Sequence, residues 1–385
     1  MRGAQRPPLT LDPKPTTLDA FTKEGMMQLD EIIKKAYSCK ASDIHLKVGT
    51  TPHMRLHNEL KPIPGFPAFT QEDMLGIAYS MMNECHREIL KVQREVDLSY
   101  HALGIGRCRT NIFWQKNTLQ ASIRIIAPII TSIRDLSLPP VLEELALCPG
   151  GLIIITGSTG SGKTTTLASM IDWINSNSKR HIITIEDPIE FLHTDKNSLV
   201  SQREIGADAL NFASALKASL RQDPDVIMLG EMRDSETIET SLIAAETGHL
   251  VLTSMHSLDT LEAINRIIAS FPDHRQHQVR AQLAGVLRAI AALKLIKIKN
   301  EGRRPCTELL IVNSSIRECI LDPLKTKNIH SFMKKDEYDV MHTFDDSLFN
   351  FWQNNLIDAD EALRLASHKD DLKLKIQGIS RRLSE

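Results

Sequence analysis

The feature that most constrains the fold of this 385-residue chain is a glycine-rich segment, GSTGSGKT, at residues 157–164. It matches G-x-x-x-x-G-K-[ST] and stands between an apolar run at residues 152–155 and a helical pattern that starts at Lys163. In such a setting the glycines let backbone N–H groups turn toward phosphate oxygens, and the positive end of the helix faces the same anion. The segment therefore predicts a strand, a phosphate-binding loop and a helix in succession.

This loop predicts a site for ATP or GTP. We expect the Lys163 ammonium to reach the β- and γ-phosphates and the Thr164 hydroxyl to bind Mg²⁺. A glycine-rich turn that binds no ligand is the alternative, which the flanking strand and helix disfavour. The expected nucleotide-binding residues are Gly157, Ser158, Thr159, Gly160, Ser161, Gly162, Lys163, Thr164 and Thr165.

Short apolar runs alternate with helical patterns on both sides of this loop. The runs at residues 151–157, 181–187, 226–231 and 249–255 are continuous, as in strands that are buried on both faces. They predict an α/β domain with a parallel-rich sheet wrapped by helices. Beyond Pro272 the pattern is largely helical, with one strand-like stretch at 307–313.

The N-terminal part has a different pattern. A helical pattern begins at Met26, and alternating segments at 96–104, 107–115 and 119–127 predict an antiparallel meander, so this part is a smaller α+β module. Several prolines fall between residues 128 and 150 and disfavour regular structure there. We expect a flexible tail at 1–25, an α+β domain at 26–135, a linker at 136–148 and an α/β domain with C-terminal helices at 149–385.

Composition excludes several classes of protein. Lys and Arg number 46 and Asp and Glu 48, a formal net charge of −2, so no overall basic field favours sequence-specific nucleic-acid binding. No two of the six cysteines stand in a C-x-x-C arrangement, so the sequence predicts neither a zinc ribbon nor a redox-active cysteine pair. Charged residues interrupt the longest apolar run, near 286–298, and prolines occupy the place of a signal peptide, so we expect a cytoplasmic protein.

Two acidic residues end neighbouring apolar runs. Glu231 follows the run at 226–230 and Glu186 follows the run at 182–185. Because ligands of open α/β sheets bind at the carboxyl ends of the strands, both side chains are expected to face the phosphates. We assign Glu231 as the catalytic base and Glu186 as a ligand of Mg²⁺ or of its water shell; a solvated strand-end acid is the alternative for each.

A histidine stands at each end of the next apolar run. His256 follows Met255, and with the two acids it is expected to donate to the γ-phosphate and report its loss. His249 lies at the opposite end of the same strand, farther from the phosphates. No direct catalytic role is expected for His249.

Together these motifs resemble the PilT family of type IV pilus retraction ATPases, within the secretion ATPase superfamily. The segments that carry the resemblance are GSTGSGKT, TIEDPIEF at 184–191, SQRE at 201–204, DPDVIMLGEMRD at 223–234 and ETGHLVLTSMH at 246–256. The resemblance implies a homohexameric ring that hydrolyses ATP and drives pilus retraction, as in twitching motility. Each subunit would have a PAS-like N-terminal domain and a RecA-like C-terminal domain. The implied partners are an inner-membrane platform protein and other pilus motor ATPases, with only peripheral membrane contact.

The resemblance also gives a role to three arginines of the N-terminal domain. Arg107, Arg109 and Arg124 match the family's nucleotide-facing strands, and two of the three are expected to act as fingers from a neighbouring subunit or across the two domains. A solvated strand face is the alternative for each.

Other functions stay open at this point. The family usually carries an Ala-Ile-Arg-Asn-Leu-Ile segment near its C-terminal side. The corresponding residues of this chain, 315–320, are SIRECI, so the arginine is retained as Arg317 but the segment is altered. A conjugation-type or type II/IV secretion ATPase, a DNA-translocating RecA-type ATPase and a catalytically weak accessory subunit of another motor are the alternatives. No aromatic residues interleave the basic cluster Lys294, Lys297, Lys299, Arg303 and Arg304, so it is interpreted as a solvated or partner-docking face.

Overall fold

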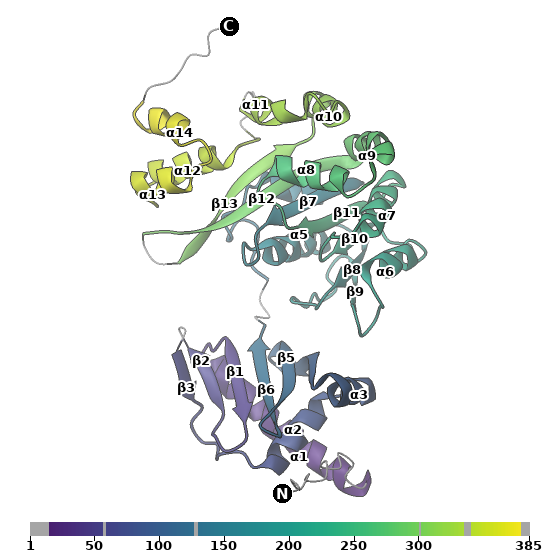
Figure 1. Ribbon diagram of the computed structural model, residues 1–385, viewed down its shortest axis with the longest axis vertical. Coiled ribbons are helices and arrows are strands. Elements are labelled where there is room, and N and C mark those ends of the chain that lie inside the picture. The colour runs from purple at the N-terminus through teal and green to yellow at the C-terminus, as the bar shows by residue number, and fades with distance from the viewer. Residues whose placement is uncertain (1–14, 57–58, 127–129, 300–301, 335–339, 379–385) are drawn as a thin grey trace, which may run out of the picture. The chain divides into compact units, whose positions relative to one another are not determined.

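The computed structural model describes residues 15–56, 59–126, 130–299, 302–334 and 340–378, with side chains from Met26 onward (Figure 1). The chain forms two compact units whose boundary falls between residues 129 and 130. Each unit has its own hydrophobic core. The predicted fold class, an α/β unit with a parallel-rich sheet preceded by a smaller α+β unit, is confirmed.

The first unit packs three helices on a six-stranded sheet. The helices are α1 (Pro15–Ser38), α2 (Gln71–Met81) and α3 (Glu84–Gln93). The strands are β1 (Asp43–Lys47), β2 (His53–Leu56), β3 (Glu59–Pro62), β4 (Glu95–Ala102), β5 (Gly106–Gln115) and β6 (Thr118–Ile125), in the order β3-β2-β1-β6-β5-β4. All neighbouring strands are antiparallel. Side chains alternate along each strand, so one face of β5, including Cys108 and Ile112, joins the core with α1 and α2.

One expectation for this unit, the flexible tail at 1–25, differs from the structure. Helix α1 begins at Pro15, so the part of the predicted tail from residue 15 to residue 25 is helical, whereas residues 1–14 lie outside the described chain. Proline is tolerated in a first helical turn because its missing N–H would have no partner there. Helices α2 and α3 are separate because Asn83 accepts a hydrogen bond from the His86 N–H (2.9 Å) and starts a new helix.

The second unit is built on a seven-stranded sheet. Its strands are β7 (Gly151–Gly157), β8 (His181–Glu186), β9 (Leu199–Glu204), β10 (Val226–Leu229), β11 (Leu250–Met255), β12 (Leu287–Lys297) and β13 (Arg303–Ile311). Their order is β13-β12-β7-β11-β10-β8-β9. All neighbouring pairs are parallel except β12 and β13. The strand that leads into the glycine-rich loop, β7, is therefore central and buried throughout.

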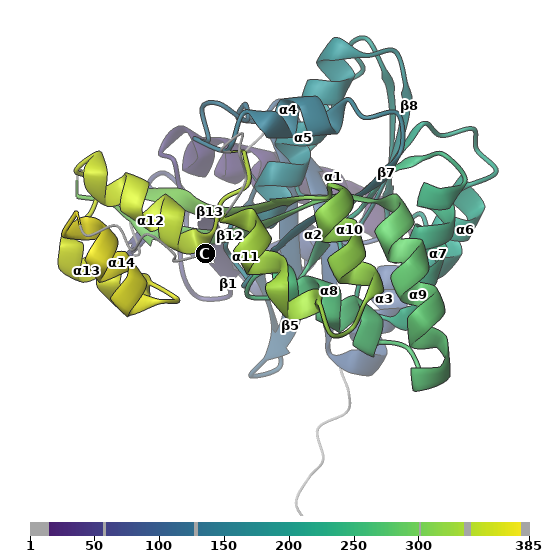
Figure 2. The same ribbon diagram turned by 90° about the horizontal axis from the view of Figure 1, so that it is seen from above.

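Helices cover both faces of this sheet. Figure 2 shows α4 (Val141–Ala146) and α5 (Lys163–Asn177) on one side, where they share a core with the sheet. The opposite face packs against α6 (Phe212–Ser219), α7 (Ser235–Glu246), α8 (Thr260–Ala269), α9 (Asp273–Val286), α10 (Ser314–Leu321) and α11 (Ile329–Met333), which a 3₁₀ turn at Thr326–Asn328 precedes. A small cluster of α12 (Phe344–Gln353), α13 (Ala359–Leu365) and α14 (Lys369–Ile376) lies beside β13. Among the described helices, none combines the length and the apolarity that a membrane span requires.

The structure corrects the predicted linker at 136–148. These residues include α4, and Leu138, Leu142 and Leu145 are buried in the second unit's core. The second unit thus begins near residue 130 and not at residue 149. Proline ends helices but does not prevent packing, and Pro140 stands directly before α4, where a proline is accommodated.

The interpretation of the region after Pro272 as largely helical is also wrong in part. Residues 287–297 form β12, which pairs with β7. An apolar run that is buried on both faces has the same appearance in a sequence as a buried helix, and only its pairing partner distinguishes the two.

Candidate nucleotide site

The glycine-rich loop joins β7 to α5 and depends on glycine at defined positions. Gly157, Gly160 and Gly162 have φ angles of 147°, 77° and 99°, values that side-chain-bearing residues rarely adopt. A Cβ atom at Gly157 would lie 2.5 Å from the Leu293 carbonyl oxygen and 2.5 Å from Ser161 Oγ. The loop therefore folds closely against β12, with its tip, residues 158–160, exposed to solvent.

Lys163 lies at the first position of α5 and its side chain turns back along the loop. It is 8% exposed, and Nζ donates hydrogen bonds to the carbonyl oxygens of Gly157 (2.8 Å) and Ser158 (3.0 Å). Ser161 Oγ is buried and has no hydrogen-bond partner among the described residues. Together with the N–H groups at the start of α5, these donors fit a phosphate group. Thr164 and Thr165 follow in the first turn, partly exposed.

The strand order brings the ends of other strands close to this loop. Strand β11 pairs directly with β7, β10 pairs with β11, and β8 pairs with β10, all in parallel. Their carboxyl ends therefore meet at one edge of the sheet, the edge at which β7 enters the loop. Thr156 extends this connection, because its Oγ1 donates to the Ser257 carbonyl oxygen (2.9 Å) just beyond β11.

Glu231 and His256 are brought together at this edge. His256 Nε2 lies 3.6 Å from Glu231 Oε2, and Arg233 Nε lies 2.6 Å from Glu231 Oε1. The Glu231 side chain is 18% exposed. The backbone around it is tied to β11, since Ser254 Oγ donates to the Gly230 carbonyl oxygen (2.6 Å).

The charges at the site act on His256. Burial lowers the pKa of this histidine, and the nearby Lys163 ammonium lowers it further, whereas Glu231 acts in the opposite direction. The imidazole is therefore mostly neutral at neutral pH. Lys163 follows β7, whereas Glu231 and His256 follow β10 and β11, so the parallel pairing of these strands brings all three to the same edge of the sheet.

Glu186 ends β8, one strand farther along the sheet. It is 4% exposed, and its Oε1 accepts hydrogen bonds from Thr184 Oγ1 (2.6 Å) and Gln202 Nε2 (3.2 Å). Strand β8 is three strand positions from β7, or about 14 Å at the usual spacing between strands. Glu231 is thus closer to the loop than Glu186, whose predicted contact with Mg²⁺ stays a prediction.

His249 lies at the amino end of β11, where its Nδ1 is 2.9 Å from the Ala244 carbonyl oxygen and 3.1 Å from Thr247 Oγ1. These contacts join it to the end of α7. His249 therefore lies at the end of β11 opposite the loop, as expected, and its lack of a direct catalytic role stays a prediction.

The three predicted finger arginines lie in the first unit, on one face of the β5–β6 pair. Arg107 and Arg109 are two positions apart on β5, so their side chains lie on the same face of the sheet. Arg109 stands directly opposite Arg124 of β6. Arg124 Nε lies 2.8 Å from Asp43 Oδ1 with a 70% exposed side chain, Arg109 is exposed and Arg107 is partly buried. Their shared face is opposite the core face of Cys108 and Ile112.

Members of the basic cluster occupy the β12–β13 hairpin and the segment after β12. Lys294 Nζ lies 3.8 Å above the Phe344 ring, and Lys299 forms an ion pair with Asp358 (2.8 Å). A cavity of about 440 Å³ lies between this hairpin and the helices α12 and α13, and Ser158 is the one residue of the glycine-rich loop in its lining. The altered SIRECI segment lies in α10, with Ile316 buried and Arg317 exposed.

Sequence reasoning missed two residues of this site. Arg233 pairs with Glu231, and Arg266 Nη1 donates to the His256 carbonyl oxygen. Arg233 stands two positions after Glu231, and this short spacing is a signal by which its proximity could have been predicted from the sequence. Arg266 lies in the last turn of α8, where an exposed arginine is indistinguishable from an ordinary surface residue.

Comparison with known proteins agrees with this geometry. Residues 131–349 match the family model described as Type II/IV secretion system protein. The chain is 38% identical to the "Twitching motility protein" of Neisseria gonorrhoeae over 84% of its length and 86% of the relative. It is 37% identical to the "Type IV pilus ATPase PilU" of Pseudomonas aeruginosa over 91% of its length and 92% of that protein.

A solved structure gives the same result for the fold. The crystal structure of the pilus retraction motor PilT with bound ADP superposes with a TM-score of 0.83 at 42% identity, and the match covers 89% of this chain and 98% of that one. The chain therefore belongs to the type II/IV secretion system protein family and, within it, to the PilT-like pilus retraction ATPases.

Proposed function

We propose that this chain is an ATP-hydrolysing motor of type IV pilus retraction. The observation that carries the proposal is the meeting of Lys163, Glu231 and His256 at one edge of the sheet. A loop that binds phosphates, a carboxylate that orients water and a histidine that senses the γ-phosphate are the parts that nucleotide hydrolysis requires. The relatives named as twitching motility and pilus retraction proteins supply the mechanical role.

In this proposal the residues of the loop act first. Gly157 to Thr165 bind the phosphates of ATP, with Lys163 leaving its carbonyl partners for the β- and γ-oxygens. The Thr164 hydroxyl and Glu186 would hold Mg²⁺, directly or through water, and when bound this ion would supply charge neutralisation at the phosphates.

Glu231 then acts as the general base. Its two oxygens face Arg233 and His256, so the carboxylate is oriented before water arrives. Removal of a proton from the attacking water by a positioned carboxylate contributes about 10²- to 10⁴-fold to a rate. His256 loses its phosphate partner after cleavage, and the segment that follows it connects this loss to α8.

The proposed assembly is a homohexamer in the cytoplasm, in peripheral contact with the inner membrane. It would act on an inner-membrane pilus platform protein, together with other pilus motor ATPases. Arg107, Arg109 and Arg124 are proposed to reach a nucleotide across domains or subunits. The support for this last role is their common placement on the non-core face of β5 and β6.

Substitution of the proposed base tests the proposal. Glu231→Gln should bind ATP with unchanged affinity and lose at least about 10²-fold in turnover. Glu236→Gln is the matched control, because this exposed carboxylate at the start of α7 pairs with Lys217 and not with the site. Lys163→Ala should lose nucleotide binding itself, and Glu186→Gln should raise the Mg²⁺ concentration required for half-maximal turnover.

Three outcomes would favour another function. Wild-type turnover in Glu231→Gln would assign the base to another residue. Binding of ATP without turnover by the unaltered protein would indicate an accessory subunit of another motor. A DNA-stimulated rate that falls steeply with salt would indicate a translocase.

A further inference from the structure

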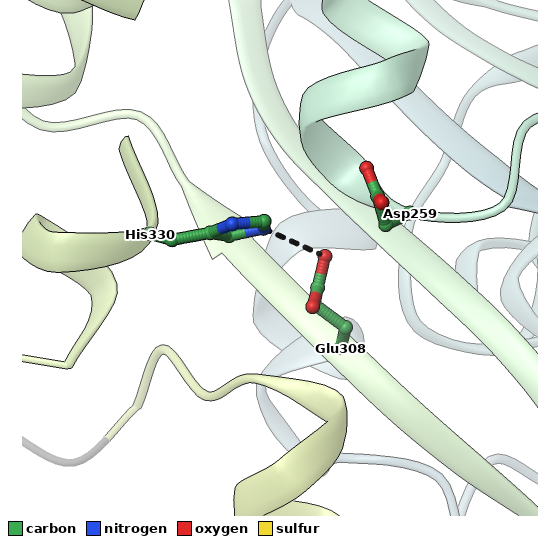
Figure 3. A group of neighbouring side chains, drawn as sticks. All are labelled: Asp259, Glu308 and His330. Carbon is green, nitrogen blue, oxygen red and sulfur yellow. Dashed lines mark ion pairs between the residues drawn. The ribbon is translucent and has the colours of Figure 1, made fainter. Parts of the chain in front are cut away.

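A second group of potential ligands lies apart from the nucleotide loop. Asp259 caps the start of α8, Glu308 lies on β13 and His330 lies on α11. One ligand-type atom from each, two carboxylate oxygens and an imidazole nitrogen, lie within 4.8 Å of one another. Figure 3 shows the His330 ring directed at Glu308, with the Asp259 carboxylate on the same side of the strand.

The spacing of these atoms is that of metal ligands more than that of a hydrogen-bonded pair. His330 Nε2 lies 3.6 Å from Glu308 Oε1, beyond a hydrogen bond. Two ligands of a tetrahedral zinc ion, each at 2.0 to 2.2 Å from the metal, are separated by about 3.4 Å. Nε2 is itself inaccessible to solvent and has no hydrogen-bond partner within the described chain.

Surrounding groups hold the two carboxylates in place. Glu308 is 3% exposed; its Oε1 accepts hydrogen bonds from the Thr260 N–H (3.0 Å) and hydroxyl (2.7 Å), and its Oε2 accepts one from the Phe344 N–H (3.4 Å). Asp259 Oδ1 accepts from the Glu262 N–H (2.7 Å), which leaves Oδ2 for another partner. Ordered outer contacts of this kind orient the ligands of metal sites.

The charge of the group also favours a cation. Two carboxylates face one imidazole, and one of the carboxylates is almost completely buried. Glu308 already accepts three hydrogen bonds, and a cation would in addition compensate the net charge of two carboxylates beside a neutral imidazole.

We propose that Asp259, Glu308 and His330 bind one divalent transition-metal ion of the zinc type, with water as the fourth ligand. An imidazole nitrogen beside two carboxylate oxygens suits Zn²⁺, whereas Mg²⁺ prefers oxygen ligands and retains most of its water. The ion would link α8, which starts just after His256, to β13 and α11. This site is separate from the proposed Mg²⁺ of the nucleotide and does not depend on the proposed function.

Metal titration of the full-length protein tests the site. The exposed cysteines 39 and 85 are first replaced by serine, because thiolates bind the same metals. The protein is then stripped with a chelator and titrated without nucleotide, first with Co²⁺ and then with Zn²⁺. One equivalent of Co²⁺ should produce the visible absorption of tetrahedral coordination, and Zn²⁺ should displace it.

Two substitutions locate the ion. Asp259→Asn removes a ligand charge but keeps the α8 cap, because asparagine caps helices as well as aspartate. His330→Gln removes the imidazole. Each should weaken Zn²⁺ binding about tenfold or more and reduce the Zn²⁺-dependent rise in Tm. His342→Gln is the control, since this histidine lies 2.8 Å from Thr307 Oγ1 and outside the group.

The results separate a metal site from a structural ion pair. Absence of saturable binding by the parent protein would overturn the proposal, as would equal Zn²⁺ affinity in the parent, Asp259→Asn and His330→Gln. If His330→Gln does not fold, the Zn²⁺ affinity of Asp259→Asn alone decides between the two interpretations. Asp259→Asn retains the cap of α8, so without metal it should have the same Tm as the parent protein.

Discussion

Arg233 and His256 lie on opposite oxygens of the Glu231 carboxylate, and this arrangement defines the site at the scale of single residues. The guanidinium holds Oε1 at 2.6 Å, whereas the histidine approaches Oε2 only to 3.6 Å. Because burial and Lys163 lower the pKa of His256, the ring is neutral near pH 7 and has one N–H and one lone pair. Such a ring can donate to a phosphate oxygen without introducing a full charge.

Gly157 permits the first test at this scale. Gly157→Ala should abolish nucleotide binding and cost about 1–3 kcal/mol of stability, because the new Cβ would meet backbone at 2.5 Å in a region of positive φ. Gly285→Ala is the matched control: it lies within α9 with nothing within 4 Å of its Cβ position, so it should stabilise by up to about 1 kcal/mol. Chemical denaturation and nucleotide titration measure both effects, and normal nucleotide affinity in Gly157→Ala would contradict the close packing of the loop on β12.

Sequence alone could locate the residues whose position follows from the chain's local pattern. Lys163, Glu231 and His256 each follow an apolar strand, and parallel strands end at a common edge. Arg266 could not be found in this way, because its contact with the His256 carbonyl depends on how α8 packs back on the sheet. Glu308 stayed hidden for a similar reason: its neighbours Asp259 and His330 come from distant segments.

At the scale of elements, several helices begin where a side chain caps the first turn. Thr70 starts α2 with a reciprocal pair: its Oγ1 accepts from the Asp73 N–H (3.1 Å), and Asp73 Oδ2 accepts from the Thr70 N–H (2.7 Å). Similar boxes start α3 and α12. Such caps satisfy N–H groups that a helix leaves without partners.

Thr70→Ala should therefore destabilise the first unit by about 1 kcal/mol, because Ala offers no acceptor to the Asp73 N–H. Thr70→Ser keeps the hydroxyl and should behave almost as the parent protein. Amide hydrogen exchange in α2 measures the effect locally, without requiring the whole chain to unfold in one step. Equal protection in the parent and in Thr70→Ala would show that packing, and not the cap, holds this end of α2.

The errors of the sequence-based prediction also belong to this scale. Alternating strands such as β4, β5 and β6 were predictable, since a half-buried strand has a period of two. Strand β12 was not, because burial on both faces removes the alternation. Residues 136–148 have prolines typical of a linker, but their leucines reach the core next to α5, a contact between segments that local pattern does not record.

At the scale of the whole molecule, the two units carry different parts of the proposed motor. The nucleotide loop, Glu231 and His256 belong to the second unit, whereas Arg107, Arg109 and Arg124 belong to the first. In a ring, each subunit presents one surface to the next subunit and a different surface to the previous one. An arginine of one subunit can therefore complete the site of another, which is a property of the assembly and not of a single chain.

Mixed rings test this arrangement. Arg109→Ala and Lys163→Ala subunits should each be nearly inactive alone, the first through loss of a finger and the second through loss of phosphate binding. If the arginine acts across subunits, a ring co-expressed from equal amounts of both should regain about one quarter of the wild-type rate, because one interface in four joins an intact loop to an intact arginine. If Arg109 acts within its own subunit, every subunit has one defect and the mixture stays inactive. The same mixing experiment with Arg107→Ala or Arg124→Ala in place of Arg109→Ala shows which of the three arginines acts across subunits. Wild-type rates in all three single arginine variants would remove these residues from the mechanism.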